Sequence, residues 1–394
     1  MLLLNLKLVT LWCQCGYGGR RVCSLSLCGS PCVLPIGMVV PVVFPLTHTH
    51  QAIMRRPFKR NNFFHALPDD LLVTILSKLA STSSSPSDFI TVLFTCKRFK
   101  DLATHRLVLS KVGVRVFAIK PKNWSENAHR FLKHCVNAGN LDACYTLGMI
   151  RFYCLQNRRS GLSLLAKAAM KQHAPSLYSL AVIQFNGSGG GKRDKDLRAG
   201  VALSARASLL GHIDALRELG HCLQDGYGVR QNIVEGRRLL VKANVRELAC
   251  VIRAVAEDSP LPSRNASSIL TCRLMRADSP VCPLLSDYGY NVAAPEVQPA
   301  NWFLREWFES GRGKLSDGLR LCANIGCGRP ETRPHEFRRC SVCGKVNYCS
   351  RGCQALDWKL RHKMECSPVE AWGEENQGEE EMENDEVIEN AVGG

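Results

Sequence analysis

The sequence predicts a mainly α-helical protein with a small metal-stabilised module near its C-terminal end. Apolar residues recur at helical spacing between residues 67 and 102, and Ala- and Leu-containing patterns recur between residues 130 and 250. Within residues 322–366, eight cysteine and histidine residues stand in four short pairs. A chain of 394 residues has room for about two or three domains, and a hydrophobic content of 45% excludes a wholly disordered protein.

The N-terminal residues 1–60 form an extension without an assigned fold, which we expect to be disordered. Its apolar stretches are short and are interrupted by Lys7 and by prolines, so they do not predict a membrane span. A weak signal peptide is the alternative. A second methionine, Met54, stands directly before the first helical pattern, so we interpret residues 1–53 as a mispredicted or dispensable extension.

Residues 61–112 are predicted to form a small helical unit. A turn with proline and an aspartate cap opens the first helix, and a serine-rich loop at 81–87 separates it from a second apolar helix. The unit has more apolar positions than its size can bury, so we expect the surplus to contact a partner. The first pattern consists of Leu67, Pro68, Asp69, Asp70, Leu71, Leu72, Ile75, Leu76 and Leu79, and the second runs from Phe89 through Cys96 to Leu102.

This pattern resembles an F-box. The resemblance implies a helical hairpin that docks onto a Skp-type adaptor and so onto a cullin–RING ubiquitin ligase. The serine-rich loop is longer than is usual in the family, but it falls between the helices. The alternative is a generic two-helix cap on the neighbouring domain. Carried over from the family, the adaptor-binding residues are Leu67, Pro68, Leu71, Ile75 and Leu76.

Residues 130–250 are predicted to form helical repeats. The anchoring residues Leu147, Leu180 and Leu219 are 33 and 39 residues apart, which corresponds to one helix pair per repeat, as in an α-solenoid. Together with Gly226-Tyr227-Gly228-Val229, the pattern resembles Sel-type repeats, relatives of tetratricopeptide repeats. The resemblance implies a concave, peptide-binding face, and an unspecialised helical bundle is the alternative.

Residues 251–318 are predicted to form a linker, because six prolines between 260 and 299 break any long helix. Within it, residues 302–308 predict an amphipathic aromatic helix that packs against the repeats or against the metal-binding module. The final residues, 368–394, include ten acidic side chains and no Lys or Arg, although the whole chain has a formal net charge of +16. We expect this acidic tail to be disordered. Because the basic residues are not clustered with aromatic ones, we do not expect a nucleic-acid partner.

The cysteine and histidine pairs have the spacings C-x4-C, C-x2-C, C-x3-C and H-x3-C. Eight soft ligands are enough for two tetrahedral zinc ions, since a closed structural site takes four S or N ligands. So short a stretch buries too little apolar surface to fold alone, and zinc binding supplies the missing free energy. The predicted ligands are Cys322, Cys327, Cys340, Cys343, Cys349, Cys353, His362 and Cys366.

The order of these ligands resembles a MYND-type zinc finger over residues 319–367. The histidine is the seventh ligand, whereas a RING finger carries it near the middle. The first pair is spaced by four residues where two is commoner, which lengthens one loop. The family's interleaved pairing implies one zinc bound by Cys322, Cys327, Cys349 and Cys353, and a second bound by Cys340, Cys343, His362 and Cys366.

MYND fingers as a family bind short proline-containing peptides. Gln354 and Trp358 match the peptide-binding positions of the family: Trp358 offers an apolar platform, and Gln354 can hydrogen-bond a peptide backbone. The alternative is that Trp358 only belongs to the core of the last helix. Closed four-ligand sites leave no open position for water, so neither zinc is predicted to be catalytic.

Together the resemblances are typical of a plant-like F-box protein with Sel-like repeats and a C-terminal MYND finger. They imply the substrate-recognition subunit of a Skp–cullin–F-box ubiquitin ligase, which is not itself an enzyme. The alternative is a zinc-finger transcriptional adaptor or scaffold without a ligase role. A lysine methyltransferase is disfavoured, because its Asn-His cofactor motif is missing from the sequence. Free thiols beside a thiolate zinc site fit a reducing compartment, so we expect the nucleus, the cytoplasm or both, and no membrane partner.

Overall fold

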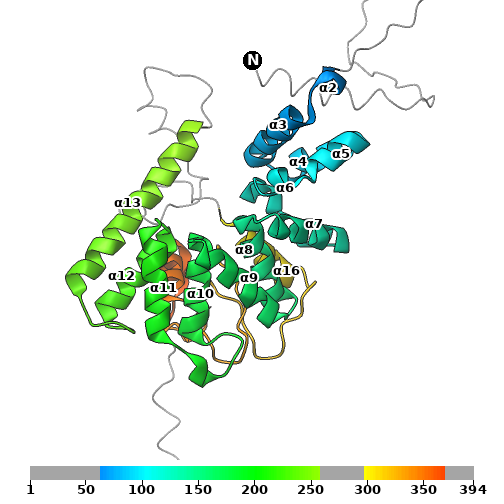
Figure 1. Ribbon diagram of the computed structural model, residues 1–394. Helices are drawn as coiled ribbons and strands as arrows, with labels where there is room; N and C mark the ends of the chain where they lie inside the picture. The colour runs from blue at the N-terminus through cyan, green and yellow to red at the C-terminus, as the bar shows by residue number, and fades with distance from the viewer. Residues whose placement is uncertain (1–62, 258–296, 369–394) are drawn as a thin grey trace, which may run out of the picture. The chain divides into compact units, whose positions relative to one another are not determined.

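The computed structural model describes residues 63–257 and 297–368, which are mainly α-helical as predicted (Figure 1). The predicted extension 1–60, most of the predicted linker and the acidic tail except its first residue, Pro368, lie outside these residues. The chain divides after Leu72 into two compact units. The first contains α2 (Phe63–Ala66) and the beginning of α3 (Asp69–Thr82), and all other elements belong to the second. None of the described helices is long and apolar enough to cross a membrane.

Short capped helices follow α3. The carboxylate of Asp88 accepts hydrogen bonds from the backbone of Ser84 and Ser85 and so caps α4, which explains why the serine-rich loop stops there. Phe89, Phe117 and Leu132 are fully buried in one core that these helices share with the start of the repeats. The elements are α4 (Pro86–Leu93), α5 (Lys97–Ala103), α6 (Arg106–Leu109), the 3-10 turns η1 (Val114–Phe117) and η2 (Pro121–Asn123), and α7 (Glu126–Asn137).

A buried asparagine joins these helices to the repeats. The Asn140 side-chain amide donates hydrogen bonds to the carbonyls of Leu109 and Val112, at 3.2 and 2.8 Å. Its carbonyl oxygen accepts from the backbone N–H of Ala143 and thereby caps α8. One side chain thus fixes the end of the preceding helices against the first repeat.

The repeats are pairs of helices, each packed on the next (Figure 1). Paired glycines allow the closest crossings: a Cβ on Gly161 would lie 2.7 Å from Phe152 Cβ and 2.8 Å from the carbonyl oxygen of Gly148. Gly220 and Gly236 repeat this arrangement between α12 and α13. The helices are α8 (Leu141–Met149), continued by a π-helical turn η3 (Ile150–Cys154), α9 (Arg158–Met170), α10 (Ala174–Asn186), the 3-10 turn η4 (Lys192–Asp194), α11 (Leu197–Leu209), α12 (Ile213–Asp225) and α13 (Ile233–Glu257).

The aromatic helix predicted within the linker is α16 (Pro299–Glu309). Phe303 and Leu304 are buried in the core of the first repeat, where Phe303 contacts the Trp124 ring edge-on at 5.4 Å. On its other side, Asn301 and Arg305 donate hydrogen bonds to carbonyls of the zinc-finger segment. The helix therefore packs against both of the partners that the sequence left as alternatives.

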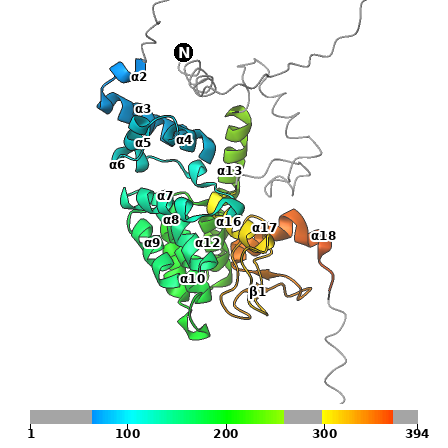
Figure 2. The ribbon, with the colours of Figure 1, turned by 90° about the vertical axis from the view of Figure 1, so that its right-hand side faces the viewer.

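The zinc-finger segment has little regular structure of its own. Among the described residues the only strands are β1 (Arg338–Arg339) and β2 (Asn347–Tyr348), which pair antiparallel with Arg338 opposite Tyr348. They are followed by α17 (Arg351–Asp357), a π-helical turn η5 (Trp358–His362) and α18 (Lys363–Glu365). Both views place this segment against the repeat helices, and α17 contacts α12 (Figure 2).

Candidate metal centre

The first group of predicted ligands forms a buried four-thiol cluster. The Sγ atoms of its four cysteines lie within 4.8 Å of one another. Cys327 and Cys349 are 3.4 Å apart, and Cys349 and Cys353 are 3.6 Å apart. The structure therefore brings together the set that the interleaved pairing implies: Cys322, Cys327, Cys349 and Cys353.

The second group is also brought together. The Sγ atom of Cys343 lies 3.4 Å from Nε2 of His362, and those of Cys340 and Cys366 lie 3.9 Å apart. Cys366 is half-buried, while the other three ligands are buried. Among the described residues, the buried Nδ1 of His362 has no hydrogen-bond partner, whereas Nε2 faces the thiols. This second set is Cys340, Cys343, His362 and Cys366.

These separations fit tetrahedral zinc. Four sulfurs bonded to one zinc at about 2.3 Å would be about 3.8 Å from one another, close to the sulfur–sulfur distances of both groups. The donors are of the S and N type that zinc prefers, and each group supplies four. When bound, two zinc ions would hold the finger together as structural ions, because neither site leaves a coordination position open.

The electrostatics of the first cluster favour a bound cation. Burial raises the pKa of the Cys322 thiol well above its ordinary value. In contrast, hydrogen bonds from Cys322 and then from Cys349 lower the pKa of Cys327 well below its ordinary value. One thiolate is thus favoured while its neighbours resist ionisation, and a divalent cation removes this conflict.

A buried arginine lies beside this cluster. The guanidinium of Arg329 donates hydrogen bonds to Sγ of Cys327 at 3.3 Å and to Oγ of Ser179 on α10 at 2.9 Å. It also stands 5.9 Å from the ring centroid of Tyr178. Although burial opposes its charge, the negative charge that Cys327 and Cys349 can carry beside it raises the pKa of Arg329. Arg329 therefore links the first zinc site to the second repeat.

A buried carboxylate makes a second link. Glu218 of α12 accepts hydrogen bonds from the backbone N–H groups of Arg351 at 3.3 Å and Gly352 at 2.6 Å, at the start of α17. Burial raises the pKa of Glu218, and these two bonds oppose the rise. The N-terminal end of α17, which supplies Cys353, is thus held by a side chain from the repeats.

Further polar contacts extend this interface. Asn186 Nδ2 donates to the carbonyl of the zinc ligand Cys349 at 2.8 Å. Arg351 pairs with Asp225 at 2.7 Å and lies over the Tyr227 ring, 3.5 Å from its centroid. The face formed by α10 and α12 is therefore occupied by the chain's own finger. Sequence reasoning missed this interface, because the partners are more than 120 residues apart and no spacing pattern relates them.

Of the two predicted peptide-binding residues, Gln354 lies in the middle of α17 and Trp358 begins η5. Gln354 is half-buried, and Trp358 is 36% exposed. The indole of Trp358 contacts the zinc ligand His362 edge-on, with centroids 5.8 Å apart. One side of the ring thus supports the finger while the rest is open to solvent.

The five predicted adaptor-binding residues differ in exposure. Leu71 and Ile75, four residues apart in α3, are 52% and 48% exposed, Pro68 is exposed and Leu67 is half-buried. Leu76 is only 4% exposed because it lies in the core with Phe89. Helical geometry explains the difference, since residues 75 and 76 point about 100° apart. Leu76 therefore cannot contact a partner in this conformation, contrary to the expectation.

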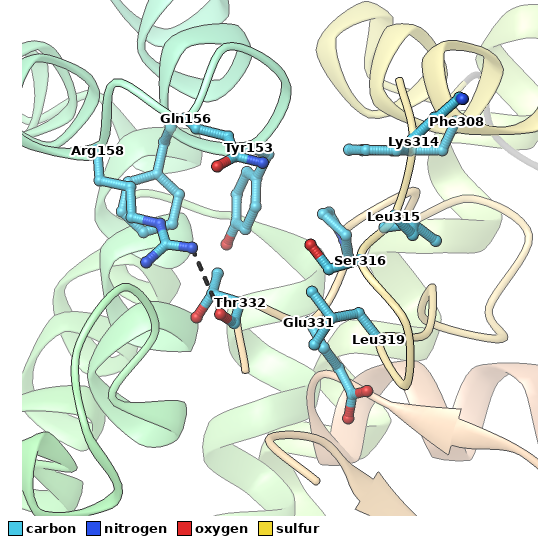
Figure 3. A pocket seen from close by; sticks show the side chains of 12 residues that line it. Tyr153, Gln156, Arg158, Phe308, Lys314, Leu315, Ser316, Leu319, Glu331 and Thr332 are labelled. Carbon is cyan, nitrogen blue, oxygen red and sulfur yellow. Dashed lines mark hydrogen bonds between the residues drawn. The ribbon is translucent and has the colours of Figure 1, made fainter. Parts of the chain in front are cut away.

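A small hollow of about 80 Å³ adjoins the finger on the side of η3. Tyr153, Arg158, Leu315 and Glu331 are among its lining residues (Figure 3). A hydrogen bond of 3.4 Å from Arg158 to the carbonyl of Thr332 crosses it. This contact ties the first repeat to the loop between the first two ligand pairs.

Three family models match the chain. A model described as plant tetratrico peptide repeats matches residues 115–218, and one described as the Sel1 repeat matches residues 213–244. The MYND finger model matches residues 322–366, which begin and end at the outermost ligands. The matched segments correspond to the repeat helices and to the two metal sites.

Among similar proteins, two from Arabidopsis thaliana match along most of their length. F-box protein At1g67340 is 64% identical over 80% of this chain and 83% of its own length. F-box protein At5g50450 is 61% identical over 79% of this chain and 87% of its own length. The yeast MYND-type zinc finger protein MUB1, from Saccharomyces cerevisiae, is 42% identical over 52 residues, or 13% of this chain and 8% of its own.

Proposed function

Because the chain belongs to the family of these F-box proteins, with helical repeats and a MYND finger, we propose that it is the substrate-recognition subunit of a Skp–cullin–F-box ubiquitin ligase. In this proposal the chain has no catalytic residues of its own. It holds a target protein near the catalytic partners, and proximity accelerates the transfer. The proposed sites of action are the nucleus, the cytoplasm or both.

The observation that carries the proposal is the exposed apolar pair Leu71 and Ile75 of α3, a helix that begins directly after Leu67 and Pro68. Large apolar side chains that remain exposed near each other are typical of a binding surface. Neither side chain belongs to a hydrophobic cluster of the described residues. We therefore assign the adaptor contact to Leu67, Pro68, Leu71 and Ile75, and omit Leu76 because it is buried.

Substrate binding is assigned to the repeats and the finger together. Because α10 and α12 hold the finger, they do not offer a free groove, and the surfaces left for a substrate lie at the edges of their interface. The exposed part of Trp358 and the amide of Gln354 are proposed to bind a short, proline-containing motif of the substrate.

Co-precipitation with a Skp-type adaptor tests the proposal. We expect the full-length chain to retain the adaptor and the double variant Leu71→Asp, Ile75→Asp to retain at most about a tenth as much, since each change places a charge in an apolar contact. The matched control is Met170→Asp with Leu209→Asp, which alters two other largely exposed apolar residues of the repeats. Undiminished binding by the Leu71/Ile75 variant would contradict the proposal.

If the unaltered chain does not retain the adaptor, the alternative of a scaffold or transcriptional adaptor without a ligase role is favoured. An adaptor-loaded chain that fails to bring any cullin into the complex would point the same way. In that case, silencing the gene would leave the set of ubiquitinated proteins, measured by mass spectrometry, unchanged.

A further inference from the structure

A hollow of about 260 Å³ lies at the junction between the repeats and the finger. It is formed by the end of α10, the segment between η4 and α11, the middle of α12 and the segment after it, and the finger around β1 and the start of α17. Phe185, Tyr227 and Phe337 supply an aromatic lining. The volume is somewhat below the range of about 300–1,000 Å³ typical of pockets for drug-sized ligands, and therefore suits one or two side chains. We call it the seam pocket.

The acidic residues of the seam pocket are already satisfied. Glu218 accepts the two backbone N–H groups at the start of α17. Glu336 accepts hydrogen bonds from the hydroxyl of Ser188 and from the backbone and hydroxyl of Thr332. Both carboxylates are buried, so they contribute little capacity to bind a further cation.

The basic residues at the rim lack hydrogen-bond and ion-pair partners among the described residues. Lys195 and Arg338 line the pocket, are exposed, and have no side-chain hydrogen bond or ion pair with any described residue. The acidic neighbours of Lys195 are used elsewhere: Asp194 accepts from the backbone of Gly191, and Asp196 caps α11. Among the described residues the rim therefore carries two cations without a direct ion pair, and the nearby carboxylates of Glu218 and Glu336, which are hydrogen-bonded elsewhere, offset only part of this charge.

The charges around Lys195 also favour binding of an anion. Partial burial lowers the pKa of Lys195 below its ordinary value, the nearby guanidinium of Arg333 adds to the effect, and the carboxylate of Glu336 opposes it. Arg333 itself is held by the carbonyls of Asn186 and Gly187 and cannot turn away. An anion bound at the rim would relieve this repulsion.

We propose that the seam pocket binds an anionic side chain, phosphoryl or carboxylate, from an extended segment of a substrate protein. Lys195 and Arg338 would contact the anion, and the aromatic lining would bury the adjoining residues of the segment. This inference rests on the proposed function and specifies its substrate class. It also assigns recognition to a surface that neither the repeats nor the finger has alone.

Fluorescence anisotropy with the zinc-loaded full-length protein tests the inference. The probes are three fluorescein-labelled pools of degenerate peptides whose central residue is phosphoserine, glutamate or serine. We expect at least one anionic pool to bind about tenfold or more tightly than the serine pool, which is the factor that one charge-assisted hydrogen bond supplies. Preference for phosphoserine over glutamate identifies a phosphoryl site, and equal binding of the two identifies a general acidic site.

The pocket variant is Lys195→Glu with Arg338→Glu, and the matched control is Lys133→Glu with Lys242→Glu, which makes the same change of net charge at exposed positions away from the pocket. We expect the pocket variant to lose the preference for anionic peptides and the control to keep it. Equal binding of all three pools, or equal binding by both variants, would overturn the inference. The pocket variant should still retain the adaptor, so failure here is distinct from failure of the ligase proposal.

Discussion

At the scale of single residues, Arg329 has the most unusual environment. It is 2% exposed, and no carboxylate pairs with it among the described residues. A zinc ion bound by four thiolates carries a net charge of about −2, which offsets a neighbouring cation. The side chain can therefore be buried because the metal site supplies its counter-ion, and its second hydrogen bond reaches Ser179 in the repeats.

We expect Arg329→Met to lower the free energy of unfolding by about 2–4 kcal/mol, because it leaves the thiolate site and the Ser179 hydroxyl without their partner. Urea unfolding followed by circular dichroism measures this loss, and chelator competition measures the accompanying drop in zinc affinity. Arg339→Met is the control, since Arg339 is exposed and should change stability by no more than about 0.5 kcal/mol. Equal midpoints for the two variants would show that Arg329 has no such role.

At the scale of elements, the glycine crossings determine how closely the repeat helices approach. Gly148 and Gly161 face each other between α8 and α9, and Gly220 and Gly236 do so between α12 and α13. In the intervening pair, a Cβ on Gly200 would lie 2.6 Å from the ring of Phe185. Small residues are thus required once in every helix pair, as expected for repeats that stack in register.

We expect Gly161→Ala to destabilise the protein by about 1–3 kcal/mol, although alanine favours helices, because its Cβ would overlap the backbone as well as the side chain of Phe152. Thermal unfolding measures the effect. Gly191→Ala serves as the control, since its Cβ would meet only Asp194 at an ordinary 3.6 Å. A midpoint for Gly161→Ala equal to or above that of the unaltered protein would contradict this account.

At the scale of the whole described second unit, the finger and the repeats behave as one folded body. Tyr178, Ser179, Asn186 and Glu218 of the repeats all contact residues at or beside the first zinc site. All four cysteines of that site also share a hydrophobic cluster with Leu177 and Val182 of α10. Loss of zinc should therefore destabilise the repeats as well as the finger.

We expect a zinc chelator to increase hydrogen exchange in α10 and α12 together with the finger, because removal of the metal unfolds the surface to which these helices bind. Exchange measured by mass spectrometry tests this, and α7 provides an internal control because, among the described residues, no hydrogen bond or ion pair joins it to the finger. Restoring zinc should restore protection. Faster exchange confined to residues 319–367 would indicate that the finger is an independent module.

The sequence predicted the metal sites well and their surroundings poorly. Ligand type and spacing are local properties, so the two groups that the structure brings together, such as Cys343 with His362, could be expected from the family pattern. Helical periodicity likewise predicted the repeats. In contrast, Arg329 and Glu218 form contacts across 150 and 134 residues, and no local pattern indicates which charged residues will be buried.

For the same reason, the sequence could not show which of two adjacent residues in α3 is buried. Ile75 and Leu76 are both apolar and adjacent, and the helical pattern is compatible with burial of either. Packing against Phe89 determines that Leu76 faces inward and Ile75 outward. The aromatic helix α16 posed a related problem, because amphipathicity predicts a buried face but not the neighbour that covers it.

The capping of α17 by Glu218 has a consequence for how this chain can be divided. A fragment that ends before the finger would leave a buried carboxylate and the Tyr178 hydroxyl without partners, and a separate finger would lose the acceptor at the start of its ligand-bearing helix. The repeats and the finger look like separate domains in the sequence, but each depends on contacts with the other. Transplanting this finger onto another scaffold would have to carry the matching surface of α10 and α12 with it.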